Sequence, residues 1–253
     1  MNLQTVKYYR QGLVDIMDRK NQEFNIVGPC SMESKGQMLQ VIEVATKLGL
    51  SYVRAQVFKP RTNPTSFQGM GAEGISILEE IKTDEINFVC EVCSNEQFEM
   101  VKDIASIIQI GARNMQNFEL LKYVSKNFKN DFVLLKRGFS NTNLEWLSSA
   151  QYLIEGGINK DKIILCERGS RSFTSPTGVS LDFINALCAK KEGFKVIIDP
   201  SHGTKHADFV IPLAKAAMAM EFDGVMVEAH PEPEKSVSDK DQAISLESLS
   251  LLF

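Results

Sequence analysis

The sequence predicts an α/β fold, a single-domain (β/α)8 TIM barrel, and three observations support this prediction. Short apolar, β-branched runs recur eight times along the 253 residues. Most of these runs are continuously apolar, which is typical of strands buried on both faces of a parallel sheet. Segments with helical periodicity separate them, and eight such units in about 250 residues is the size of this barrel. An open doubly wound sheet is the alternative, but eight near-equal units leave no obvious edge strand.

The eight expected strands follow one another at regular intervals. They are residues 25–29, 52–58, 88–92, 104–110, 132–136, 163–167, 195–200 and 224–229. Between them, apolar side chains recur at helical spacing, as Met38, Val41 and Ala45 do. The expected helices are residues 36–48, 74–81, 95–103, 117–128, 144–155, 179–191 and 208–220. We therefore expect a catalytic barrel over residues 25–253, preceded by an N-terminal extension, residues 1–24, with a short amphipathic helix at 8–19 that covers the barrel floor.

Composition excludes several classes of protein. The chain has 28 Lys and Arg against 32 Asp and Glu, a net charge of −4, so a general nucleic-acid binder is not expected. An apolar run of 18 or more residues does not occur, so no membrane span is expected. The chain has five cysteines. An odd number of cysteines without a recognisable secretory signal peptide fits a cytoplasmic location better than a disulfide scaffold.

The ends of the expected strands carry most of the candidate functional residues, and in such barrels the active site forms at the C-terminal ends of the strands. Charged or metal-binding residues close nearly every strand: Cys30, Lys59, Arg61, Glu91, Arg113, Lys136, Arg137, Arg168, His202 and Glu228. Grouping several cations at one mouth has an electrostatic cost that a polyanionic ligand would offset. The sequence therefore predicts a phosphorylated substrate, with more than one phosphate.

Cys30, His202 and Glu228 form a second subset, because thiolate, imidazole and carboxylate together suit one divalent metal ion: Mn, Fe, Co or Zn. They end the first, seventh and eighth strands, which are neighbours in a closed barrel. Asp239 could supply a fourth ligand. The alternatives are a small buried hydrophobic role for Cys30 and a backbone-bonded loop position for His202.

Two other motifs carry less weight. Residues 69–74 match GxGxxG, but they follow a proline-containing loop and not a strand, so we expect a turn before the next helix. Residues 90–93 match CxxC, but the pair spans a strand end, where residues three apart face opposite sides. Two packed thiols are therefore expected there, not a redox or zinc site.

Several short stretches, taken together and in order, resemble one family. They are Gly-Pro-Cys-Ser at 28–31, Phe-Lys-Pro-Arg-Thr at 58–62, Gln-Ile-Gly-Ala-Arg-Asn-Met-Gln-Asn at 109–117, Leu-Leu-Lys-Arg-Gly at 134–138, Cys-Glu-Arg-Gly at 166–169, Asp-Pro-Ser-His-Gly at 199–203, Val-Glu-Ala-His-Pro at 227–231 and Ser-Asp at 238–239. In them the chain resembles the 3-deoxy-D-arabino-heptulosonate 7-phosphate (DAHP) synthases of the short microbial type, type I beta-like, without a regulatory domain. Enzymes of this family condense phosphoenolpyruvate with erythrose 4-phosphate and release phosphate, at the entry to the shikimate pathway of aromatic amino-acid biosynthesis.

The resemblance implies roles for individual residues. It implies a divalent metal bound by Cys30, His202, Glu228 and Asp239. It implies phosphoenolpyruvate binding by Lys59, Arg113, Lys136 and Arg168, with Arg54 nearby, and erythrose phosphate binding by Arg61 and Thr62. It also suggests a homodimer or homotetramer. We expect Lys59 to donate a proton to the forming alkoxide, with a pKa lowered by arginine neighbours.

Some features leave alternatives open. Residues 54–57 are bulkier than the glycine-rich stretch expected in the family, and residues 170–178 lack the usual pattern, so the acceptor sugar is less defined than the donor. The alternative function is 3-deoxy-D-manno-octulosonate 8-phosphate synthase, which uses arabinose 5-phosphate. A Schiff-base aldolase with Lys136 as nucleophile and a non-catalytic sugar-phosphate sensor are further alternatives. We expect no inhibition by Phe or Tyr, since there is little chain outside the expected barrel.

Overall fold

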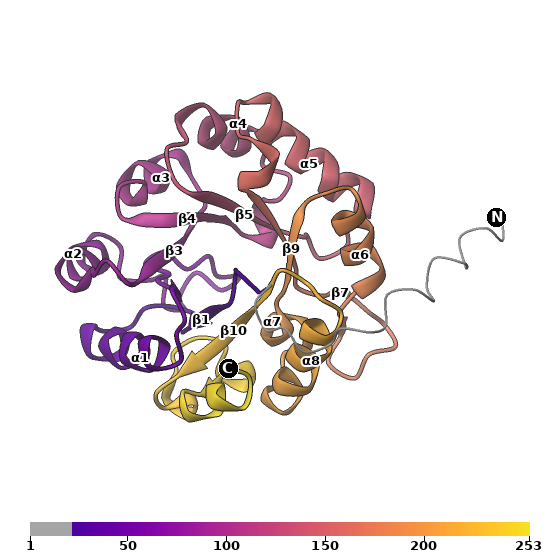
Figure 1. Cartoon of the computed structure of the whole chain (residues 1–253). Coiled ribbons are helices and arrows are strands. Elements are labelled where there is room, and N and C mark those ends of the chain that lie inside the picture. The colour runs from indigo at the N-terminus through magenta and orange to yellow at the C-terminus, as the bar shows by residue number, and fades with distance from the viewer. Residues whose placement is uncertain (1–21) are drawn as a thin grey trace.

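The computed structural model describes residues 22–253, so the helix expected at 8–19 lies outside the described residues. Eight parallel strands form a closed barrel, with β1 paired to β10 to complete the ring. Figure 1 shows the strands at the centre and the helices around them. The strands are β1 (Ile26–Gly28), β2 (Tyr52–Arg54), β3 (Asn87–Val92), β4 (Ala105–Ile110), β5 (Phe132–Lys136), β6 (Ile163–Glu167), β9 (Lys195–Ile198) and β10 (Gly224–His230). The (β/α)8 barrel predicted from the sequence is confirmed.

Helices follow the strands in alternation and, apart from the short α7 at the end of β9, cover the outer face of the barrel. They are α1 (Lys35–Lys47), α2 (Ala72–Ile81), α3 (Asn95–Val101), α4 (Phe118–Asn127), α5 (Asn143–Glu155), α6 (Phe183–Lys191), α7 (Pro200–Thr204) and α8 (Ala207–Ala219). Short 3₁₀ helices are η3 (Ala112–Asn114), η4 (Lys160–Lys162), η5 (Pro233–Lys235), η6 (Lys240–Gln242) and η7 (Glu247–Leu251). Side-chain caps start several helices, and α5 has a full capping box between Thr142 and Glu145. None of the helices within residues 22–253 is long and apolar enough to cross a membrane.

The barrel interior is layered, and the layers explain where the site lies. Alternate residues of a strand face the interior. The layer of inward-facing side chains that lies further from the C-terminal strand ends is apolar and fully buried. It includes Ile26, Val89, Leu134 and Ile197. The next inward position on each strand is polar in most cases, as in Arg54, Glu91, Gln109, Lys136 and Glu228. A polar layer therefore begins two residues above a closed apolar floor.

Three differences from the expected elements concern short segments. The second strand ends at Arg54, so residues 55–58 continue without ladder pairing into the loop that carries Lys59. The helix expected over 179–191 is wrong at its start, because β8 (Val179–Ser180) pairs with β7 (Ser170–Arg171) in an antiparallel hairpin. A short β11 (Ile244–Ser245) extends the pairing of β10.

Candidate active site at the strand ends

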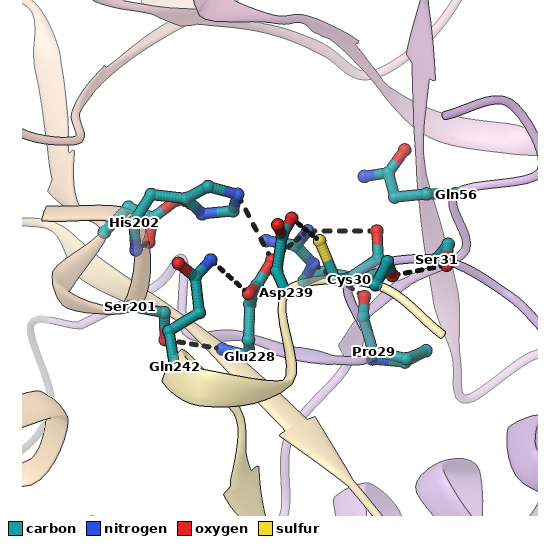
Figure 2. A network of polar contacts seen from close by, with 12 residues as sticks. Pro29, Cys30, Ser31, Gln56, Ser201, His202, Glu228, Asp239 and Gln242 are labelled. Carbon is teal, nitrogen blue, oxygen red and sulfur yellow. Dashed lines mark hydrogen bonds and ion pairs between the residues drawn. The ribbon is translucent and has the colours of Figure 1, made fainter. Parts of the chain in front are cut away.

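Four side chains that could together hold a metal ion meet at the seam where β1, β9 and β10 adjoin. Cys30 follows β1, His202 lies in α7 directly after β9, Glu228 belongs to β10, and Asp239 lies in the loop after β10. One ligand atom from each lies within 4.8 Å of the others. Figure 2 shows these side chains pointing toward one another. The structure thus brings together all four residues that the sequence analysis proposed as a metal site.

The chemistry of this cluster fits a divalent cation. Asp199 Oδ2 lies 2.8 Å from His202 Nδ1, which assigns the ring proton to Nδ1 and leaves the Nε2 lone pair facing Glu228. Burial lowers the pKa of His202, which favours the neutral ring that a metal requires. Burial and Glu228 raise the pKa of the Cys30 thiol well above its usual range, and a bound cation is what would favour the thiolate.

Neighbouring groups hold the buried Glu228 carboxylate in place. Arg54 Nη2 lies 3.0 Å from Oε1, and Gln242 Nε2 donates to Oε2 at 2.5 Å. The Glu228 backbone N–H donates to Ser201 Oγ at 2.9 Å. Burial raises the pKa of Glu228, but His202 and Arg54 outweigh burial, and the net pKa is lowered. The carboxylate is therefore charged and oriented before any ligand binds.

Close backbone packing lets Arg54 reach this carboxylate. Gly28 has a φ of +133°, and a Cβ there would lie 3.2 Å from the backbone of Arg54. The Arg54 Nε donates to the carbonyl of Pro29 at 3.0 Å. Its Nη1 is buried and has no hydrogen-bond partner among the described residues. That orphaned donor is available to a ligand in the site.

Lys59 lies beside the metal-binding cluster. Its Nζ is 2.5 Å from Cys30 Sγ and 3.1 Å from Asp239 Oδ2. Burial lowers the pKa of Lys59, but Cys30, Glu228 and Asp239 outweigh it, and the net pKa is raised. The expected lowered pKa is therefore wrong, because its nearest charged neighbours are acidic groups and not arginines.

The other predicted cations differ in their surroundings. Lys136 is buried and lies 2.6 Å from Asp199 Oδ2. Arg113 lies in η3 and Arg168 follows β6, and neither forms an ion pair with a carboxylate within residues 22–253. Arg61 is half-buried and Thr62 exposed, in the loop after β2.

Arg137 does not belong with these cations. It follows the last residue of β5 and belongs to the strand-end charges predicted from the sequence, but its Nη1 contacts Glu167 Oε2 at 2.9 Å and Asp182 Oδ2 at 3.1 Å. Two carboxylates therefore already compensate its charge, which sets it apart from Arg113 and Arg168.

Asp199 is the functional residue that the sequence analysis missed. Its carboxylate is fully buried and contacts both His202, a candidate metal ligand, and Lys136, a candidate phosphate ligand. Burial raises the pKa of Asp199, but His202 and Lys136 hold it well below its usual range. The residue stands in the Asp-Pro-Ser-His-Gly stretch, which contained the only sequence signal for it.

A cavity of about 350 Å³ lies next to Lys59. Its lining includes Phe58, Pro60, Cys93 and Gln97. A larger hollow of about 480 Å³ lies between α4 and α5, but it contains none of the predicted site residues. We therefore associate the smaller cavity with the site.

The two weaker sequence motifs lie outside the four-donor cluster. Gly71 precedes α2 with a φ of 58°, and its N–H donates to the carbonyl of Val57 at 2.9 Å, so the GxGxxG match is a turn before a helix, as expected. Cys90 and Cys93 are both free thiols, and neither belongs to the metal-binding cluster found among residues 22–253.

The fold and the site together define the class: a (β/α)8-barrel protein whose strand ends combine a four-donor cluster with several cations. The profile of the DAHP synthetase I family matches residues 6–252. A phospho-2-dehydro-3-deoxyheptonate aldolase of Thermotoga maritima is 42% identical over 241 residues, which are 93% of this chain and 70% of that protein. The chain therefore belongs to the DAHP synthetase I family, and the enzyme class expected from the sequence is confirmed.

Solved structures agree with this assignment, and a second group of relatives is less similar. The crystal structure of the Thermotoga maritima DAHP synthase matches with a TM-score of 0.84 and 41% identity, covering 90% of this chain and 67% of that chain. A truncated form of that enzyme matches with a TM-score of 0.80 and 38% identity, over 90% and 84% of the two chains. A 2-dehydro-3-deoxyphosphooctonate aldolase of Desulfotalea psychrophila is 28% identical over 94% of this chain and 90% of that protein. The octulosonate enzyme is the more distant relative.

Proposed function

We propose that this protein condenses phosphoenolpyruvate with erythrose 4-phosphate to give 3-deoxy-D-arabino-heptulosonate 7-phosphate and inorganic phosphate, with the help of a divalent metal. One observation carries the proposal: the four-donor cluster and the cations Lys59 and Lys136 occupy the same end of one barrel. Two anionic substrates and an aldehyde need both kinds of group close together.

Phosphoenolpyruvate is assigned to Arg113 and Arg168, which lack carboxylate partners within residues 22–253, together with Arg54 and Lys136, which have them. Arg113 and Arg168 offer guanidinium N–H groups that suit a phosphate in a bidentate arrangement. Arg54 adds the buried Nη1 donor that has no partner among the described residues. Lys136 lies beside this set, with Asp199 as its counter-ion. These residues would fix one face of the enol toward the acceptor.

The acceptor is assigned to the loop after β2. Arg61 and Thr62 lie there, next to the cavity of about 350 Å³ that Lys59 lines. A guanidinium and a hydroxyl in an accessible loop suit the phosphate of a sugar that enters after the donor. The aldehyde end would then lie toward Lys59 and the metal-binding cluster.

Cys30, His202, Glu228 and Asp239 would hold one divalent ion, Mn, Fe, Co or Zn. Such an ion supplies Lewis-acid polarisation of the aldehyde oxygen when it is bound. The raised pKa of Lys59 keeps its Nζ protonated beside the cluster, so that this group can give a proton to the alkoxide formed at the aldehyde carbon.

The reaction balances with one water. C3 of the enol forms the new carbon–carbon bond to the aldehyde carbon, and the carbonyl oxygen takes the proton from Lys59. Water adds to C2, and one of its protons restores the Lys59 ammonium. Breaking the C2–O bond to phosphate then gives the C2 carbonyl and releases inorganic phosphate, which takes the remaining hydroxyl proton. The guanidinium groups of Arg113 and Arg168 would stabilise the phosphate charge throughout.

The structure argues against the Schiff-base alternative. A nucleophilic lysine must have its amine free to attack a carbonyl, but Lys136 Nζ is buried and ion-paired to Asp199 Oδ2 at 2.6 Å. The aldol addition therefore does not use Lys136 as a covalent nucleophile in this proposal.

The experiment that tests the proposal follows loss of phosphoenolpyruvate with erythrose 4-phosphate or arabinose 5-phosphate, before and after chelator treatment. We expect consumption with the four-carbon sugar, loss of activity after chelation and recovery on addition of Mn, Fe, Co or Zn. Preference for arabinose 5-phosphate would overturn the acceptor assignment and favour the octulosonate reaction. Full activity without metal would overturn the role of the cluster.

Oligomeric state belongs to the same proposal. We propose a homodimer or homotetramer, as the family resemblance suggests. Sedimentation velocity would check it, and a single monomeric species across micromolar concentrations would contradict it.

A further inference from the structure

Phe139 lies in the loop between β5 and α5, and its half-buried ring is surrounded by guanidinium groups. The guanidinium carbon of Arg168 lies 4.7 Å from the ring centroid, and that of Arg113 lies 5.5 Å from it. The guanidinium carbon of Arg171 is 6.0 Å away. These distances fall within the range of cation–π contacts. One phenyl ring therefore contacts both arginines that are assigned to phosphoenolpyruvate.

Few other contacts fix these two arginines. Arg168 Nη1 donates to the carbonyl of Gly169 at 3.2 Å. No side-chain hydrogen bond of Arg113 is present within residues 22–253, and no carboxylate pairs with either residue there. Two flexible cations at one mouth repel each other and lose rotamer freedom on binding. An ordered binding site needs a group that holds them without neutralising them.

An aromatic ring meets this requirement in a way that a carboxylate does not. A carboxylate would occupy guanidinium N–H groups and cancel their charge, as Glu167 does for Arg137. A ring face contacts the flat side of the guanidinium and leaves its N–H edge free. The free edge is the part that a phosphate recognises.

The backbone around Phe139 is itself held from two sides. The Arg171 N–H donates to the carbonyl of Phe139 at 2.7 Å, which ties the ring's loop to the β7–β8 hairpin. The Gly138 N–H contacts Met115 Sδ at 3.1 Å, which ties the same loop to the segment after η3. The ring position is therefore fixed by the two segments that carry Arg171 and Arg113.

We propose that Phe139 is a positioning residue that holds the guanidinium groups of Arg113 and Arg168 by their faces, so that their N–H edges stay free for the phosphate of phosphoenolpyruvate. This inference rests on the proposed function, since it deepens the donor half of that site.

The test uses the full chain and compares Phe139→Leu with Phe139→Tyr. Phe139→Leu removes the π face and keeps an apolar side chain, whereas Phe139→Tyr keeps the face. Phe173→Leu is the matched control, because Phe173 is a fully exposed phenyl in the β7–β8 hairpin with no ring contact among the described residues. Calorimetry measures phosphoenolpyruvate binding, and steady-state kinetics measure KM for each substrate separately.

We expect Phe139→Leu to raise the Kd and KM for phosphoenolpyruvate about tenfold, since one or two cation–π contacts are lost. The KM for erythrose 4-phosphate should change less than about twofold, and Phe139→Tyr and Phe173→Leu should bind like the wild type. A merely structural role would change both KM values and the melting temperature together.

A fluorination series keeps the test decisive even where Phe139→Leu folds poorly. Phenylalanine with one, two or three ring fluorines at position 139 withdraws π density while nearly preserving shape, so Kd for phosphoenolpyruvate should rise with each fluorine. If the Kd for phosphoenolpyruvate did not change along the fluorinated variants while the wild type bound and turned over normally, the role of Phe139 would be overturned and the proposed function would stand. A wild-type protein that does not bind phosphoenolpyruvate would overturn both.

Discussion

Asp199 shows how one buried carboxylate connects the two halves of the site. It contacts His202 Nδ1 at 2.8 Å and Lys136 Nζ at 2.6 Å. Through the first contact it orients the imidazole toward the metal-binding cluster, and through the second it positions a cation beside the donor arginines. No pattern of residue types predicts such a double contact, because it depends on which residues face each other across β5 and β9.

The role of Lys59 gives a direct prediction. Lys59→Ala should lower kcat by about 100-fold or more, because the alkoxide loses its positioned proton donor. The measurement is steady-state turnover on metal-loaded protein, with circular dichroism to check the fold. Lys59→Arg is the matched control: it keeps the positive charge beside Cys30 and Asp239, but its planar guanidinium does not place a donor where the Lys59 ammonium lies. Substantial turnover in Lys59→Ala would refute this role.

Cys30 gives a second prediction at this scale. Cys30→Ala should weaken binding of the divalent metal by more than about tenfold, because one of four donors is lost. Competition with a chromophoric chelator measures the affinity. Cys188→Ala is the control, since Cys188 is an exposed free thiol on α6. Equal metal affinity in Cys30→Ala and the wild type would remove Cys30 from the ligand set.

The β7–β8 hairpin and α6 meet at Asp182, which starts the helix. Its side chain accepts from the Asn185 N–H at 3.0 Å and contacts Arg137 Nη1 at 3.1 Å. Burial raises the pKa of Asp182, but the hydrogen bonds from Asn185 and Arg137 outweigh burial, and the net pKa is lowered. Asp182→Ala should reduce the free energy of unfolding by about 1 kcal/mol at neutral pH.

The lowered pKa of Asp182 sets the pH dependence of this effect. A carboxyl group with a lowered folded pKa contributes stability above its unfolded pKa of about 3.9, and loses it as pH falls through the folded value. The difference in free energy of unfolding between wild type and Asp182→Ala, measured by urea unfolding, should therefore be largest at pH 7 and decrease below about pH 4. Asp84→Ala, in an exposed turn after α2, is the control. A difference in free energy of unfolding that stayed constant with pH would contradict the charged role of Asp182.

The same elements show what sequence patterns can and cannot predict. The strands at 132–136 and 163–167 were predicted to the residue, because both faces are apolar and turn residues bound them. The β7–β8 hairpin was missed because two-residue strands are too short to have a periodic pattern. The contacts of Phe139 were missed because a single aromatic in a loop becomes informative only when three arginines from different segments surround it.

At the scale of the whole molecule, the metal-binding cluster lies at the seam that closes the barrel. Its ligands come from β10 and from the segments after β1, β9 and β10, and β1 pairs with β10 to complete the ring. A bound ion would therefore tie together the first and last parts of the described chain. Because the ion would bind the folded barrel and not the unfolded chain, its binding free energy adds to the free energy of unfolding.

Metal removal should consequently lower the melting temperature. At a free metal concentration about a thousand times Kd, the added stability is about 4 kcal/mol, which for a domain of this size corresponds to about 8–16 °C. Calorimetry of the metal-loaded and chelator-treated protein measures the difference, and Cys30→Ala should show a much smaller one. If metal analysis showed the ion bound and the melting temperature did not change, the ion would bind the unfolded chain as well as the folded one, and the folded four-donor cluster would not be its specific site.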